Sequence, residues 1–421
     1  MAGCVKAGQW VIVSTNGEKR LLKVDAASRV YVGKDRLPAI GLVGMPFGAV
    51  VTAENGAVCV DDRLAEDVSG VFAEWASAAE GDEEKRTNKD LFDDGKAQAL
   101  GQAEIAKLRA QGLQGEEIVR EIAQNSATFE SKTAFSQHKY LKKKAKKYTP
   151  VVQLVKPTPT ELCEVYAQSG KLDKIHELRA DSLALLIARS CARAGARVLV
   201  LDTGTGLVAG ALAQRLGGHG SLLMAHARPH VPLDGVHQLN LRDDEWAPIA
   251  SAPLDDVRNF LEGLAGAEPA AEAATPVAAA GGGEGAPAAA PPGEPEFRSE
   301  RSGGRSFRRF SPEQTARWLA EGCDTLVIAM HATTPELVQT LIRALRPSGS
   351  VVVYNACMSP LVRIAEQLAS PSSAVMNVQL CESWAREYQV LPNRTHPVMT
   401  NVIPSGFVLS GFARPASDVK R

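Results

Sequence analysis

The stretch that decides the fold is RVLVLDTGTGLVAGALAQRLGG, residues 197–218. It runs from an apolar strand that ends in Asp202, through Gly204 and Gly206, into a helical pattern. An acid at the end of a buried strand, followed by a glycine turn and a helix, is typical of the first unit of a nucleotide-binding α/β sheet, because glycine lets backbone N–H groups approach a ligand. The stretch therefore predicts a doubly wound, Rossmann-like domain.

The surrounding sequence repeats the alternation of strand and helix that such a sheet requires. Apolar strands are predicted at SLLMAHA (221–227), TLVIAMH (325–331) and SVVVYNA (350–356), and helices at 172–194, 206–216, 312–319 and 335–345. This alternation predicts an α/β domain over residues 150–421.

One segment of that domain, residues 265–309, breaks the pattern. It is rich in Ala, Gly, Pro and Glu and ends in the arginine-bearing run RSERSGGRSFRRF (298–310). Because this composition buries little apolar surface, we predict a disordered insertion. We interpret its arginines as a solvated tail, with contact to RNA as the alternative.

The N-terminal residues predict a second fold. Short strands, QWVIVST, RLLKVDA, RVYVGK and GAVVTA, alternate with turns such as Asn16-Gly17 and Asn55-Gly56. Turns at this spacing favour a β-barrel-like antiparallel domain over residues 1–72, either closed or an open sheet.

Residues 73–95 are acidic and predict a flexible excursion. Residues 96–149 predict a helical, basic connector.

The connector ends in NSATFESKTAFSQHKYLKKKAKKY (125–148), which holds seven lysines between Lys132 and Lys147 and no acid after Lys132. Read as a helix from about Ala134, it gathers Phe135, Leu141, Ala145 and Tyr148 on one side, by the helical period. The lysines spread over the other side, which suits a polyanion. The RNA-binding candidates are Lys132, Lys139, Lys142, Lys143, Lys146 and Lys147. The alternatives are a solvated charged helix and a nuclear localisation signal.

The bulk composition limits the classes of function. With 421 residues the chain is long enough for two cores, and its formal net charge of −1 means that any RNA binding depends on a local patch. Seven scattered cysteines without a C-x-x-C pair, and His226, His230 and His237 without ligands at metal-binding spacing, argue against disulfides and a metal site. We expect a soluble intracellular protein without a membrane span.

The glycine turn departs from the pattern of a working cofactor site. S-adenosylmethionine-dependent methyltransferases carry [DE]-x-G-x-G-x-G, which Asp202, Gly204 and Gly206 match, whereas Val208 stands at the third glycine. The second strand ends near His226 and the fourth near Met330-His331, so acids are missing where the cofactor ribose and the target base would be held. We therefore predict a methyltransferase-like domain with a degenerate cofactor loop, no catalytic residues and no cofactor of its own.

In two rival interpretations the chain is itself an enzyme. The first is an active S-adenosylmethionine-dependent RNA methyltransferase whose loop tolerates Val208. The second is a dinucleotide-dependent oxidoreductase, for which Arg228 and His230 are poor substitutes for the ribose-binding acid.

Several motifs resemble one family in both regions. DD-x-x-AQ runs from the end of the excursion into the connector, which holds G-x-E-I-V, N-S-x-T-F, K-T-x-F-S-Q and K-Y-x-x-K-K. The α/β domain holds K-I-x-x-L-R-x-D-[ST]-L and R-E-[YW]-Q-V-L-P-x-R-T-H-P. These motifs resemble the RNA-binding, non-catalytic subunit of the eukaryotic tRNA (adenine-58-N1) methyltransferase. The resemblance covers most of the chain outside the acidic excursion and the insertion.

The resemblance implies a function and a set of partners. The chain would hold tRNA in a heterotetramer, two-plus-two, with a homologous catalytic subunit that binds S-adenosylmethionine and methylates N1 of adenine 58. We expect the complex in the nucleus.

Arg394 and His396 lie in the last motif and allow two interpretations. Arg394 contacts an RNA phosphate or the subunit boundary, where its planar fork suits bidentate binding. Alternatively the segment is a structural loop, with Arg394 paired to an acid and His396 hydrogen-bonded to backbone.

Overall fold

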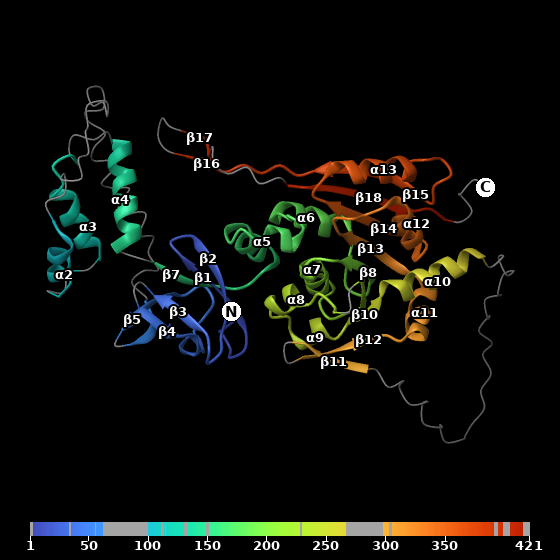
Figure 1. Cartoon of the computed structure of the whole chain (residues 1–421), viewed down its shortest axis with the longest axis horizontal. Coiled ribbons are helices and arrows are strands. Elements are labelled where there is room, and N and C mark those ends of the chain that lie inside the picture. Colours follow the sequence, from blue (N-terminus) through green and yellow to red (C-terminus); the bar gives the residue numbers. More distant parts are fainter. Residues whose placement is uncertain are drawn as a thin grey trace, which may run out of the picture. The chain divides into compact units, whose positions relative to one another are not determined.

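The computed structural model divides into two compact units, Met1–Pro157 and Thr158–Arg421 (Figure 1). The structure describes residues 3–32, 35–54, 56–61, 100–110, 113, 115–129, 134–148, 151–227, 230–266, 298–302, 305–390, 395–398 and 405–415. The predicted excursion at 73–95 lies outside these residues.

Unit 1 contains a five-stranded antiparallel sheet in the order β2-β1-β7-β5-β6. Its strands are β1 (Trp10–Thr15), β2 (Glu18–Lys23), β5 (Val50–Glu54), β6 (Ala57–Val60) and β7 (Val152–Val155), and β3 (Arg29–Val32) pairs separately with β4 (Asp35–Pro38), followed by η1 (Ala39–Leu42). Alternating apolar residues such as Val11, Val13 and Leu154 form its core, as the period of a half-buried strand requires. Among the described residues no pairing joins β2 to β6, so the five strands form an open sheet.

The strand β7 places the boundary between the units later than residue 150. It follows the helical connector in sequence but lies between β1 and β5, with Val13 opposite Leu154 and Val50 opposite Gln153. The apolar pattern of Val152–Val155 was assigned to the α/β domain because a short strand carries no signal of which sheet it joins.

The connector contains three described helices, α2 (Gln102–Ala110), α3 (Gly115–Gln124) and α4 (Ala134–Tyr148). Ile105, Ile118 and Ile122 form one buried cluster, and Val119, Ala123 and Leu141 form another. These spacings of three and four residues place the apolar side chains of each helix on one face, so the helices bury those faces against one another.

Unit 2 contains a nine-stranded sheet in the order β11-β12-β10-β9-β8-β13-β14-β18-β15. The core strands are β8 (Arg197–Asp202), β9 (Ser221–His226), β10 (Ile249–Pro253), β13 (Cys323–Ala329), β14 (Leu345–Asn355), β15 (Val375–Glu382) and β18 (Phe407–Ala413). The five strands from β10 to β14 are parallel, and β18 runs antiparallel to both of its neighbours. A small pair, β16 (Tyr388–Gln389) and β17 (His396–Pro397), follows β15.

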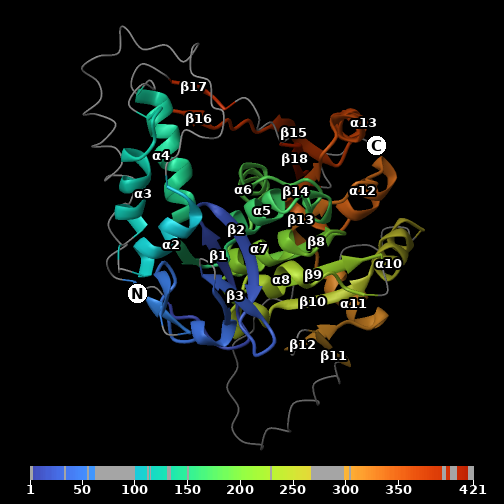
Figure 2. The same ribbon diagram turned by 60° about the vertical axis from the view of Figure 1, so that its left-hand side comes forward.

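Helices cover the sheet in two groups (Figure 2). The first group is α5 (Pro159–Gln168), η5 (Leu172–Ile175), α6 (Ala180–Arg189), α7 (Leu207–Leu216), α8 (Asp234–Gln238) and α9 (Asp243–Trp246). The second is α10 (Leu254–Gly266), α11 (Pro312–Ala320), α12 (Pro335–Ile342) and α13 (Met358–Leu368). Leu199 and Leu201 pack in one core with residues of the second group, as alternation along a buried strand requires. None of the described helices is long and apolar enough to cross a membrane.

The predicted disordered insertion at 265–309 is wrong at both of its ends. Helix α10 continues to Gly266, and β11 (Arg298–Ser302) pairs antiparallel with β12 (Arg305–Arg309) at the edge of the large sheet. Composition missed the two strands because backbone pairing with β10 and one buried side chain, Phe307, order a segment that is otherwise polar.

We expect a fragment of residues 1–157 to unfold in a single cooperative thermal transition, followed by circular dichroism. A fragment of residues 1–149 lacks β7, which supplies the pairing on both sides of the sheet's centre, and should show no such transition. Equal cooperativity of the two fragments would contradict the assignment of β7 to unit 1.

Candidate functional site

The glycine loop after β8 is held by the buried carboxylate of Asp202. Its Oδ1 accepts a hydrogen bond from the backbone N–H of Gly204 at 2.9 Å, and its Oδ2 accepts one from Val208 at 3.0 Å. Val208 lies in the first turn of α7 and is buried. Burial raises the pKa of the Asp202 carboxyl, and the hydrogen bonds from backbone oppose that rise. The carboxylate therefore fixes the turn and the start of α7.

The two glycines of the loop lie against protein backbone. A Cβ atom at Gly204 would lie 2.8 Å from the carbonyl oxygen of Lys174, and one at Gly206 would overlap the carbonyl oxygen of Pro232. The backbone N–H of Gly235 also donates to the carbonyl oxygen of Thr205 at 2.8 Å. Glycines that let a ligand approach in a nucleotide-binding fold here let two segments of the same chain approach.

A buried histidine that sequence reasoning did not select completes this cluster. His176 Nε2 lies 3.3 Å from Thr203 Oγ1 and 3.9 Å from Asp202 Oδ1, and its ring meets the ring of His331 edge-on at 4.6 Å between centroids. It adopts a positive φ of 57° at the end of η5. The KIHELRADSL segment was noted as a family motif only, because nothing in its spacing indicates that residue 176 reaches the glycine loop.

The other strand ends hold loops in place. Asn355, at the end of β14, donates to the carbonyl oxygens of Met330 and His331 at 3.1 and 3.0 Å. Tyr354 is fully buried and donates to the carbonyl oxygen of His176 at 3.2 Å, and burial raises the pKa of its phenol. His226 is buried at the end of β9. Among the ends of β8, β9, β13 and β14, only that of β8 is an acid, as the sequence indicated.

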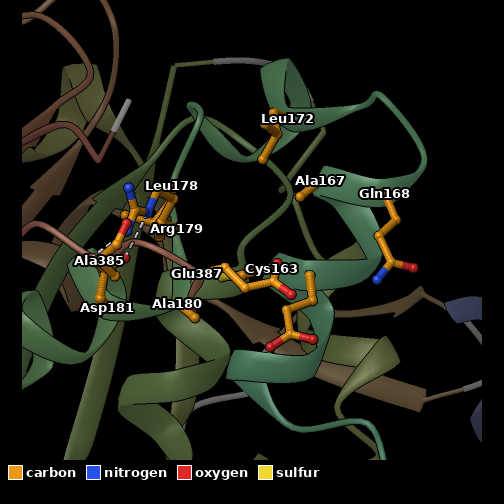
Figure 3. Close-up of a pocket in the computed structure, with 11 residues that line it drawn as sticks. Cys163, Ala167, Gln168, Leu172, Leu178, Arg179, Ala180, Asp181, Ala385 and Glu387 are labelled. Atoms are coloured by element: carbon orange, nitrogen blue, oxygen red, sulfur yellow. Dashed lines mark hydrogen bonds and ion pairs between the residues drawn. The ribbon is translucent and has the colours of Figure 1, made fainter. Parts of the chain in front are cut away.

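A cavity of about 520 Å³ lies beside α5 and η5 (Figure 3). Arg179 closes one wall, where it donates to both carboxylate oxygens of Asp181 at 2.9 Å and to the carbonyl oxygen of Ala385 at 3.2 Å. Burial raises the pKa of the Cys163 thiol to about 12, which keeps it protonated and unreactive. The residues that line this cavity include none from 202–208.

Helix α4 presents a row of exposed lysines, Lys139, Lys143 and Lys147, spaced four residues apart. The opposite side is anchored: Leu141 is buried, and the Gln137 side chain donates to the carbonyl oxygen of Phe129 at 2.9 Å. Lys144 differs from the row in being half-buried, with its Nζ over the Tyr140 ring at 5.1 Å. Lys147 also lies over a ring, that of Tyr148 at 5.3 Å, but stays exposed. The helix thus separates one packed lysine from three exposed ones.

The remaining predicted RNA-binding residues are only partly visible. Lys132 and Arg394 lie outside the described residues, as do the side chains of Lys142 and Lys146. His396 is exposed, and its Nδ1 lies 3.0 Å from the carbonyl oxygen of Pro397, which agrees with the structural interpretation of that residue. Within the described ranges, no group of three or more His, Cys, Asp or Glu residues is arranged to hold a metal ion.

The topology of unit 2, with its glycine loop after β8, defines a Rossmann-like methyltransferase fold. A solved structure with this fold, an S-adenosylmethionine-dependent O-methyltransferase from Thermotoga maritima, aligns with a TM-score of 0.50 at 8% identity over 98% of this chain and 95% of that chain. At this identity the likeness concerns the fold alone.

The chain belongs to the Gcd10p family, whose model matches residues 4–280. Among its relatives, the mouse protein is 29% identical over 97% of this chain and 88% of its own length, and the Dictyostelium discoideum protein is 30% identical over 97% and 79%. Both are named tRNA (adenine(58)-N(1))-methyltransferase non-catalytic subunit, TRM6 or trm6. The resemblance inferred from the motifs is confirmed, and the chain is a non-catalytic subunit of a methyltransferase complex.

We expect Gly206→Ala to destabilise the full-length chain by more than Gly217→Ala in denaturant unfolding. Both glycines flank α7 with positive φ, 79° for Gly206 and 60° for Gly217. Because alanine disfavours this left-handed conformation, each change should lower the free energy of unfolding by about 1–2 kcal/mol. Only at position 206 does the new Cβ also overlap the Pro232 carbonyl, which should add about 1–3 kcal/mol. Equal losses would show that the 232 segment does not press on the loop.

Proposed function

We propose that this chain is the tRNA-binding and scaffolding subunit of the tRNA N1-methyladenosine-58 methyltransferase, and that a homologous partner performs the chemistry. The observation that carries the proposal is the contrast between its two candidate sites. The glycine loop is covered by the chain's own backbone, while α4 holds three lysines exposed on one row.

The lysine row suits the backbone of a nucleic acid. Residues four apart on a helix rise about 6 Å along its axis, so the row presents charges at regular intervals. Each lysine that neutralises a phosphate releases counterions, and this release supplies affinity that does not depend on sequence. Because Leu141 and Gln137 anchor the opposite side, the helix can present these charges without itself being displaced.

We include Lys132, Lys142, Lys146 and Arg394 in the RNA-binding surface on the grounds of charge and sequence position. In this proposal the chain acts in a two-plus-two heterotetramer in the nucleus, and S-adenosylmethionine binds to the catalytic partner. We include scaffolding because tRNA and the methyl donor would bind to different subunits. A subunit that binds tRNA contributes to methylation only when it is assembled with the subunit that binds the methyl donor.

An active methyltransferase is the rival function. It needs space at the glycine loop for the donor and a carboxylate for the ribose hydroxyls. The contacts of Gly204 with the Lys174 carbonyl and of Gly206 with the Pro232 carbonyl oppose the first requirement. His226 at the end of β9 does not meet the second, because imidazole is not a bidentate acceptor.

We expect the triple substitution Lys139→Ala, Lys143→Ala, Lys147→Ala to weaken tRNA binding and to lower the slope of log K against log salt. Each lost phosphate contact should lower that slope by about 0.7–0.9. The measurement is a filter-binding titration of the full-length chain at several salt concentrations.

The matched control is Lys6→Ala, Lys156→Ala, Lys171→Ala, which removes the same charge from exposed positions elsewhere. Its slope should stay near that of the wild type. If both triple variants lose the same slope, the effect is one of net charge and α4 is not the RNA-binding element.

We expect no saturable binding of S-adenosylmethionine to the full-length chain in calorimetry, and none to Val208→Gly. Restoring the third glycine leaves the backbone of Lys174 and Pro232 in place over the loop. The isolated catalytic partner serves as the positive control. Micromolar binding by the wild type would overturn the proposal, whereas binding by Val208→Gly alone would show that the valine side chain, and not the covering backbone, excludes the donor.

A further inference from the structure

Another cavity, of about 870 Å³, lies at the amino edge of the parallel strands of unit 2. Its walls come from α12, the end of α13 and the adjoining ends of β14, β15 and β18 (Figure 1). It is lined by Leu345 and Pro347 at the start of β14, whereas Tyr354 near the other end of that strand pairs with Ala329, which pairs in turn with Asp202. The cavity and the glycine loop therefore lie at opposite ends of the strands.

The charged groups that line this cavity are two arginines, Arg343 and Arg414, and no Asp or Glu is among its described lining residues. Each guanidinium donates one hydrogen bond to a backbone carbonyl oxygen, at 3.3 Å for Arg343 and 3.5 Å for Arg414. Both are long for an N–H···O bond. Within the described ranges neither arginine makes an ion pair, and the acids of the two helices, Glu336 and Glu366, are exposed outside the cavity.

The position of the Arg414 guanidinium leaves one of its donors unused. Its Nε–H is buried and has no hydrogen-bond partner among the described residues. A buried donor without a partner lowers the stability of the protein. An anion in the cavity would let the guanidinium turn and donate two parallel hydrogen bonds from its planar fork. The unmet donor thus indicates a ligand.

Capping of helix ends explains only part of this arrangement. The helices α12 and α13 both end at the cavity, and a helix end with about half a negative charge favours a nearby cation. However, each arginine uses only one of its five N–H groups on a carbonyl. The two guanidinium charges also exceed the two half charges, so the cavity keeps about one positive charge.

The rest of the lining combines apolar and uncharged polar groups. The Gln339 amide donates to the Gln367 amide oxygen at 2.9 Å, which leaves the N–H groups of Gln367 as donors. The hydroxyls of Ser370 and Ser372 share one hydrogen bond at 3.0 Å, which leaves one O–H to donate. The aliphatic lining residues include Ile342, Leu345, Leu368 and Val375.

We infer that this cavity binds a small organic phosphate of the size of a nucleoside monophosphate. The guanidinium groups of Arg343 and Arg414 hold the phosphate, the amide and hydroxyl groups bind the sugar and the base edge, and the aliphatic side chains contact the base. The cavity volume lies within the range of about 300–1,000 Å³ that is usual for such sites. A fatty acid would leave the amides unused, and inorganic phosphate would leave the aliphatic wall unused. The inference does not depend on the proposed function.

The test is a calorimetric titration of the full-length chain with AMP, GMP, CMP and UMP. At least one of the four should bind saturably, and the corresponding nucleoside and inorganic phosphate should each bind at least about tenfold more weakly, because each lacks one part of the contacts. In the double variant Arg343→Gln, Arg414→Gln the affinity should fall at least about tenfold, as expected for the loss of one charge-assisted hydrogen bond. No saturable binding of any of the four nucleotides overturns the inference.

The matched control is Arg317→Gln, Arg363→Gln, which removes the same charge from exposed positions on α11 and α13 outside the cavity. Its affinity for the nucleotide should equal that of the wild type. If the two double variants lose the same affinity, the effect is one of net charge and the inference fails.

Should the cavity variant fold poorly, hydrogen exchange of the wild type locates the ligand. A saturating concentration of the nucleotide should slow amide exchange in residues 367–375 and 411–415, since a bound ligand suppresses local opening. Unchanged exchange in both segments, or slowing confined to the glycine loop at 202–208, overturns the inference.

Discussion

Close packing of main chain on main chain at Gly204 and Gly206 is the constraint on which the carboxyl edge of unit 2 depends. It requires glycine at both positions, because a Cβ at either would meet a carbonyl oxygen. It fixes the segments that contain Lys174 and Pro232, and through the first of these it positions His176 beside Asp202. The hydrogen bond from Tyr354 to the His176 carbonyl then ties this edge to the centre of the sheet. The glycine loop thus links three segments of unit 2 through backbone contacts.

This arrangement explains how a methyltransferase fold can persist in a non-catalytic subunit. Asp202 and the two glycines still serve folding, since the carboxylate accepts hydrogen bonds from the turn and the glycines admit the covering backbone. At the place of a third glycine stands Val208, and β9 ends at His226 and not at an acid.

Much of this could be predicted from the sequence. The strands β8, β9, β13 and β14 follow from apolar runs and from the glycine turn, and the family follows from motifs that recur over most of the chain. The lysine row on α4 follows from helical periodicity. The role of His176 could not be predicted, because it arises from a contact between residues far apart in sequence. The ordering of β11–β12 was missed for a related reason: its stability comes from pairing with β10, which composition does not report.

The position of β7 also affects how the protein is made. Val13 pairs with Leu154, so the sheet of unit 1 cannot be completed until the ribosome has synthesised the residues between β6 and β7, which include α2, α3 and α4. A hairpin such as β1–β2 alone is marginally stable in water. During synthesis at roughly 5–20 residues per second, the early strands therefore remain exposed for several seconds before their central neighbour emerges. An N-terminal domain usually folds before the next domain is synthesised. In this chain, folding of unit 1 is delayed until translation has almost reached unit 2.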